Sequence, residues 1–107
     1  MDTISPKKGK TLIVHIVMFK FKEENKSENI NKATAMLNAL PEKIQPLLSM
    51  EVGQDFSQTE RAFDLSLYST FNSKEDLATY ATHPAHLEVV SFIKEVTELS
   101  RVVDYVK

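Results

Sequence analysis

The chain is built from short stretches whose hydrophobic patterns fit strands and helices in turn. Residues 12–21 form a nearly continuous apolar run, rich in β-branched and aromatic side chains, which predicts a strand covered on both faces. Apolar and polar residues alternate at 48–53 and 63–71 and predict two further strands. Residues 101–106 predict the last strand.

Two stretches between these strands carry apolar residues at helical spacing. Ser27 can cap the first helix, which Pro41 ends or bends. Asn72 or Ser73 caps the second, which continues to about Glu98. Its broad apolar face consists of Leu87, Val89, Val90, Phe92, Ile93 and Val96.

A proline divides this second helical stretch into two helices. Pro84 favours the first turn of a helix and biases the residue before it away from helical geometry. We therefore expect one helix to end near Thr82 and another to begin at Pro84, with His83 near its N-cap.

The resulting order β-α-β-β-α-β predicts an α+β protein, with a ferredoxin-like antiparallel sheet that carries its helices on one face. Since the first strand is apolar on both sides, a second copy of the same sheet is the simplest cover for the open face, giving a dimeric α+β barrel. We expect this homodimer-forming domain at 11–107, preceded by a flexible N-terminal tail at 1–10.

The amino-acid composition excludes some classes of binding partner. The 107 residues include no cysteine and carry a formal charge of −2, which gives no electrostatic footprint for nucleic acid. The apolar run at 12–19 contains His15, precedes Lys20 and is too short to cross a bilayer, so it predicts a buried strand rather than a signal peptide or membrane segment. We expect a soluble, cytoplasmic protein without nucleic-acid or membrane partners.

The helix break brings two chemically active side chains toward one another. Tyr80 and His86 would diverge on an unbroken helix, whereas a kink between them allows the phenol and the imidazole to converge. His86, Val90 and Ile93 follow i, i+4, i+7 spacing, so the imidazole should point toward the core. Its place near a helix N-terminus favours the neutral ring, which can accept a proton. The alternative is a purely structural junction whose histidines satisfy nearby backbone groups.

A metal site is a further alternative for the same histidines. His83 and His86 are spaced i, i+3, and His15 could supply a third nitrogen. Because two histidines at this spacing are a weak signal, we predict no metal ligands and no cofactor.

The chain resembles a known family in three places. These are the first strand His-Ile-Val-Met-Phe-Lys-Phe-Lys at 15–22, the junction Tyr-x-x-His-Pro-x-His at 80–86, and the closing Val-Asp-Tyr at 103–105. Together they resemble the stress-responsive A/B barrel (Dabb) family of the dimeric α+β barrel superfamily, over roughly residues 11–107. The resemblance implies a homodimer whose two sheets close into a barrel. Many members are stress-induced proteins without an assigned reaction.

One branch of this family, similar to the plant olivetolic acid cyclase, closes a polyketide ring without a cofactor. The resemblance implies Tyr80 and His86 as catalytic residues and adds Asp104 and His15. Asp104 could hold His86 in one tautomer, or it could simply be an exposed strand residue. The first helix lacks the aromatic side chains of that branch, so the polyketide substrate is not carried over.

Two functions follow. The first is a homodimeric stress-response domain that binds a small, partly apolar molecule between helices and sheet, with His15, Val17, Phe19 and His83 in contact with the ligand. The alternative is a cofactor-independent enzyme, a cyclase, lyase or oxygenase, that uses Tyr80 and His86.

Overall fold

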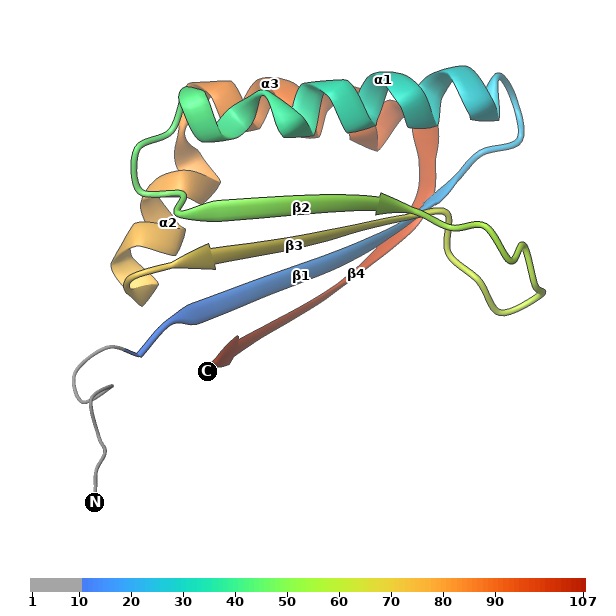
Figure 1. Cartoon of the computed structure of the whole chain (residues 1–107). Coiled ribbons are helices and arrows are strands. Elements are labelled where there is room, and N and C mark those ends of the chain that lie inside the picture. Colours follow the sequence, from blue (N-terminus) through green and yellow to red (C-terminus); the bar gives the residue numbers. More distant parts are fainter. Residues whose placement is uncertain (1–10) are drawn as a thin grey trace.

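The computed structural model describes residues 11–107 of the chain (Figure 1). The expected tail at 1–10 lies outside the described residues. The elements follow in the order β1 (Ile13–Phe21), α1 (Lys26–Asn38), a 3-10 turn η1 (Leu40–Glu42), β2 (Ser49–Gln54), β3 (Leu65–Phe71), α2 (Lys74–Thr82), α3 (Pro84–Val96) and β4 (Thr97–Val106).

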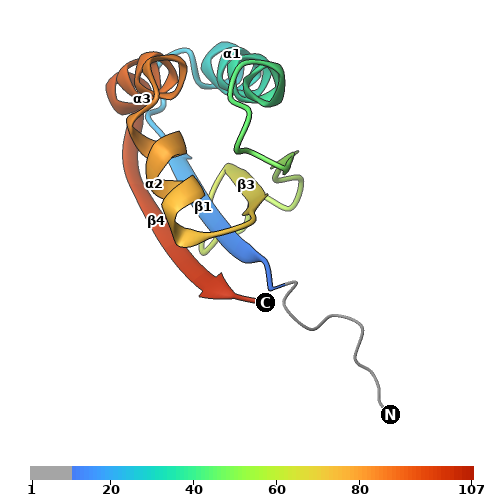
Figure 2. The same ribbon diagram turned by 90° about the vertical axis from the view of Figure 1, so that its left-hand side faces the viewer.

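The strands form one antiparallel sheet in the order β2-β3-β1-β4. All helices of the described part lie on one face of this sheet, with α1 and α3 side by side above it and α2 at one end (Figure 2). This arrangement confirms the predicted α+β, ferredoxin-like fold.

The core lies between the helices and the sheet. Ala33 and Leu37 of α1 and Val89 and Ile93 of α3 are buried there, because they lie on one side of each helix at intervals of four residues. The sheet and the connecting segments supply the remaining buried apolar side chains, among them Phe19, Phe21, Leu40, Ile44, Leu47, Leu65, Leu67, Phe71 and Tyr80.

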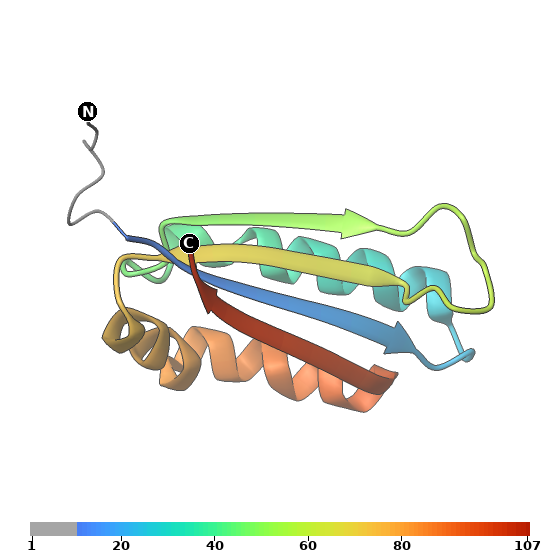
Figure 3. The same cartoon turned by 90° about the horizontal axis from the view of Figure 1, so that it is seen from below.

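No helix of the described part of the chain lies over the opposite face of the sheet (Figure 3). Side chains on this face include Met18, Val103 and Tyr105, which alternate with the residues that point toward the helices. Their exposed fractions are 39%, 57% and 41%. The structure therefore has the open apolar face that the two-sided pattern of the first strand predicts.

The helix caps explain where α2 and α3 begin. The hydroxyl of Ser73 accepts a hydrogen bond from the backbone N–H of Asp76 at 3.0 Å and caps α2. His83 has extended backbone geometry, and its Nδ1 accepts from the N–H of Ala85 at 3.0 Å. Pro84 is the first residue of α3, so the predicted helix break is confirmed.

Three local predictions are wrong. The N-cap of α1 is Asn25 rather than Ser27, because a left-handed residue (φ 53°) turns the chain into the helix without a side-chain cap. β4 begins at Thr97 rather than Arg101, since α3 ends at Val96 and the chain enters the sheet directly. Leu87 lies outside the buried face of α3, with 50% of its surface exposed.

A buried carboxylate fastens the end of the sheet that is remote from α2. Asp64 accepts from the N–H of Phe21 at 2.8 Å through its side chain, and its own N–H donates to the carbonyl of Phe19 at 2.9 Å. The ammonium of Lys26 lies 3.7 Å from the same carboxylate. Asp64 thus joins β1, the segment before β3 and the start of α1.

Within the described residues, no helix is long and apolar enough to cross a membrane.

Candidate functional site

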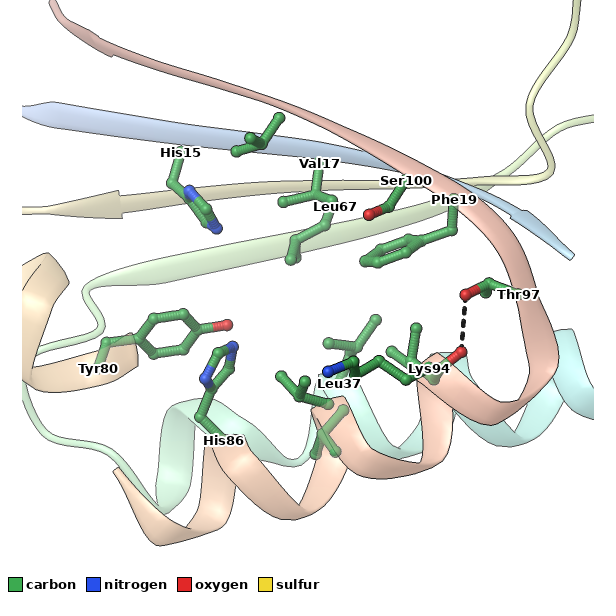
Figure 4. Close-up of a pocket in the computed structure, with 14 residues that line it drawn as sticks. His15, Val17, Phe19, Leu37, Leu67, Tyr80, His86, Lys94, Thr97 and Ser100 are labelled. Carbon is green, nitrogen blue, oxygen red and sulfur yellow. Dashed lines mark hydrogen bonds between the residues drawn. The ribbon is translucent and has the colours of Figure 1, made fainter. Parts of the chain in front are cut away.

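A cavity of about 230 Å³ lies between the helices and the sheet (Figure 4). Since a cavity of roughly 150 Å³ already holds a benzene molecule, this one has room for a substituted ring or a short acyl chain. Its lining is mostly apolar, as is typical of small-molecule sites. The lining residues are His15, Val17, Phe19, Leu37, Leu67, Tyr80, His86, Val89, Val90, Ile93, Lys94, Thr97, Ser100 and Val102.

His86 projects from the first turn of α3 into this cavity. Its Nδ1 lies 3.0 Å from the carbonyl oxygen of Ala81, which is one of the last carbonyls of α2 and has no partner within that helix. Because a carbonyl only accepts, Nδ1 carries the proton and the neutral ring keeps its lone pair on Nε2. Burial lowers the pKa of His86 from 6.5, partly opposed by the bond to Ala81. A neutral imidazole with a free acceptor nitrogen therefore lines the cavity at pH 7.

Tyr80 comes from the last turns of α2 and is almost fully buried, with 1% of its surface exposed. Its ring centroid lies 4.3 Å from that of His86, 5.1 Å from that of Phe71 and 6.2 Å from that of His15. The predicted convergence of the phenol and the imidazole is thus confirmed. Among the described residues the hydroxyl of Tyr80 has no hydrogen-bond partner. Burial raises its pKa, so the hydroxyl stays protonated as a donor.

His15 and Asp104 are paired across β1 and β4. Their backbones are direct neighbours in the sheet, and His15 Nδ1 lies 2.5 Å from Asp104 Oδ1. Of the two alternatives for Asp104, the orientation of His86 is not the arrangement found, since the strand register brings the carboxylate to His15 and a backbone carbonyl orients His86.

The other predicted ligand-contacting residues separate into two groups. Val17 and Phe19 line the cavity together with His15. His83 is not among the lining residues, because its ring turns back to cap α3. Among residues 11–107 no group of three or more His, Asp or Glu side chains is arranged to hold a metal ion.

Sequence reasoning did not include Lys94 and Ser100, which also line the cavity. Lys94 lies eight residues after His86, so the two share one stripe of α3 with Val90 between them. The spacing from His86 would therefore have predicted that Lys94 lies beside the same cavity. Ser100 was missed because the predicted last strand begins after it.

Tyr80→Phe should stabilise the free protein. A buried donor without a partner costs about 1 kcal/mol or more, and phenylalanine keeps the ring while removing that donor. We expect a rise of about 5 °C in the melting temperature. A fall in the melting temperature of Tyr80→Phe would mean that the hydroxyl is hydrogen-bonded in solution.

These features define a class: a ferredoxin-like α+β protein with an apolar open sheet face and a cavity that holds a tyrosine–histidine pair. The model of the stress responsive A/B barrel domain family (Dabb) matches residues 13–107, and the chain belongs to this family.

Similar proteins occur in plants. One stress-response A/B barrel domain-containing protein of Arabidopsis thaliana is 40% identical over 79 residues, which are 74% of this chain and 30% of the relative. A second protein of the same description and organism is 28% identical over 101 residues, which are 90% of this chain and 47% of the relative. The chain therefore spans less than half the length of these two relatives.

Solved structures share the fold. A dimeric protein of unknown function with a ferredoxin-like fold from Bacteroides fragilis is 33% identical, with a TM-score of 0.81 over 88% of this chain and 94% of that one. The hydroxynitrile lyase of Passiflora edulis superposes with a TM-score of 0.80 over 90% of this chain and 93% of its own, at 21% identity. The likeness to the lyase is one of fold alone.

Proposed function

We propose that this chain forms a homodimeric stress-response domain that binds a small, mostly apolar molecule in the cavity between α2, α3 and the sheet. The observation that carries the proposal is the buried hydroxyl of Tyr80 beside the cavity, which has no hydrogen-bond partner within residues 11–107. Buried polar groups normally have partners, and a bound ligand with an acceptor oxygen would supply the missing one.

The size and lining of the cavity support a ligand of this kind. About 230 Å³ bounded largely by Val, Leu, Ile and Phe side chains favours an apolar body. The polar groups gathered at the Tyr80 and His86 end favour one or two oxygen atoms on the ligand.

The proposal of a dimer rests on a separate observation, the apolar face of the sheet that no helix of residues 11–107 covers. Met18, Val103 and Tyr105 are large side chains exposed together on this face. An apolar face of this kind is typical of an interface between copies. The similar protein from Bacteroides fragilis is dimeric.

The ligand proposal is tested by filling the cavity. Val90 lines the cavity, whereas Leu87, one turn earlier on α3, does not. Both Val90→Phe and Leu87→Phe enlarge the side chain, but only the first occupies ligand space. Melting temperatures are measured with and without a set of small aromatic acids, short-chain acids and ketones.

We expect a compound in hundredfold excess over its Kd to stabilise the wild type and Leu87→Phe by about 2.7 kcal/mol and to leave Val90→Phe unchanged. Comparing each variant with its own ligand-free state removes the cost of overpacking itself. Equal stabilisation of all three proteins would contradict binding in this cavity.

A second candidate function is favoured by the state of His86. A neutral imidazole with a free Nε2 beside a protonated phenol can take a proton from a carbon next to a carbonyl while the phenol donates to the developing enolate oxygen. The cavity could in this way support a cofactor-independent lyase, cyclase or isomerase reaction. The hydroxynitrile lyase of Passiflora edulis is a lyase with the same fold.

A further inference from the structure

The lining of the cavity includes a positively charged side chain. Lys94 is the lining residue with a permanent positive charge, and no aspartate or glutamate of residues 11–107 is among the lining residues. Within the same part of the chain, Lys94 makes no ion pair at salt-bridge distance. Within residues 11–107 the cavity thus combines an apolar body with the exposed ammonium group of Lys94, while the carboxylate of Asp104 lies behind the ring of His15.

The side chain of Lys94 is turned toward the polar end of the cavity. In Figure 4 it runs along α3 with its nitrogen directed to the side on which His86 lies. His86, Val90 and Lys94 follow one another at intervals of four residues, so they form one stripe of α3 that borders the cavity, with Lys94 at its exposed end. The backbones of His86 and Lys94 are separated by about 12 Å along the helix. Because the lysine side chain extends toward His86, its ammonium group lies closer to the imidazole than the two backbones lie to each other.

Because His86 is neutral, the electrostatic preference of the lining for an anion comes from Lys94. Among the lining residues of 11–107 a carboxylate ligand meets the ammonium group of Lys94 and no carboxylate, because Asp104 lies behind the ring of His15, whereas a cationic ligand would be repelled by the exposed Lys94. The free hydroxyl of Tyr80 remains available as a further donor.

We propose that the ligand is the anion of a small apolar carboxylic acid, whose carboxylate binds the ammonium of Lys94 while its apolar body fills the space beside Val17, Leu67 and Val90. This inference rests on the proposed function, since it names the class of molecule that the same cavity takes.

The experiment compares acids with neutral molecules of the same shape. The probes are benzoate and hexanoate, each paired with its amide, benzamide and hexanamide. Affinities are measured by NMR titration of the isotope-labelled full chain, with shifts followed at α3 and β1. The variants are Lys94→Met, which keeps an apolar stem, Lys94→Arg, which keeps the charge, and Lys43→Met, which removes a lysine outside the cavity.

We expect each acid to bind the wild type roughly fivefold more tightly than its amide, the upper range for a partly exposed ion pair. Lys94→Met should abolish this preference, and Lys94→Arg and Lys43→Met should retain it. Added salt should weaken the acids more than the amides. Bound carboxylate should also raise the pKa of His86, which the amide should not do.

A failure of the anion inference can be distinguished from a failure of the proposed ligand binding. Equal binding of acid and amide to the wild type, or a preference that survives in Lys94→Met, would overturn the anion inference and leave the cavity as a binding site. Absence of shifts around the cavity with both members of both pairs would count against ligand binding there altogether, and against this inference with it.

Discussion

Val103→Asp should prevent formation of the homodimer proposed above and leave a monomer. Val103 lies on the open face of the sheet and is 57% exposed in the isolated chain. In a two-fold interface the substitution enters twice, and each short carboxylate would be buried without a partner, at a cost of several kcal/mol. Light scattering should give twice the 12.2 kDa mass of the chain for the wild type and the single mass for the variant.

A neighbouring residue provides the matched control. Val102 has the same exposed fraction, 57%, but its side chain points to the helix side of β4. Val102→Asp carries the same charge and the same loss of strand propensity, yet it should remain dimeric. A dimeric Val103→Asp, or equal dissociation of both variants, would contradict pairing through the open face.

His86→Gln should lower any proton-transfer activity of the cavity by about a hundredfold. A positioned general base contributes roughly that factor or more, and glutamine keeps a polar side chain without a titrating nitrogen. The measurement is the exchange of the protons next to the carbonyl of acetophenone for deuterium in heavy water, followed by NMR. A wild-type protein that does not accelerate this exchange would count against the catalytic candidate.

The exchange rate should depend on pH in a direction that follows from the pKa of His86. Burial lowers the pKa of His86 below 6.5, so the ring is a neutral base above that pH and becomes charged as the pH falls. The exchange rate should be flat above pH 6.5 and fall at lower pH. The stability that the neutral ring contributes follows the same direction, full above 6.5 and lost as the pH falls through the pKa of the folded state.

His83→Asn is the control for both measurements. Asparagine is a good N-cap, so this variant removes an imidazole from the same junction and keeps the start of α3. It should retain the exchange activity and its pH profile. A loss equal to that of His86→Gln would mean that the junction as a whole, rather than His86 as a base, is required.

The main features of the fold could be predicted because they depend on local chemistry. The apolar run of β1 and the steric rule for Pro84 each act over a few residues, and both predictions are confirmed. The convergence of Tyr80 and His86 followed from the second of them. The beginning of α1 could not be predicted in this way, because the left-handed geometry of Asn25 competes with the capping preference of Ser27.

The surroundings of His86 depend on contacts that the sequence does not encode locally. Which side chain faces Asp104 is decided by the register of β4 against β1, and that register brings it to His15. The true acceptor for His86 is a backbone carbonyl, which has no residue-type signal. Ser100 was missed because the polar residues Thr97, Glu98 and Ser100 hide the early start of β4. Lys94 was missed because a charged residue is not counted in an apolar stripe.

The bond between His86 and Ala81 makes the tautomer of the imidazole robust to mutation. A side-chain acceptor disappears with a single substitution, but the carbonyl of residue 81 is present whatever amino acid occupies that position. What keeps this carbonyl free is the interruption of the helix at Pro84, which ends the hydrogen-bond ladder of α2. Substitutions that alter the bend at 82–84 should therefore change the pKa of His86 more readily than substitutions at residue 81.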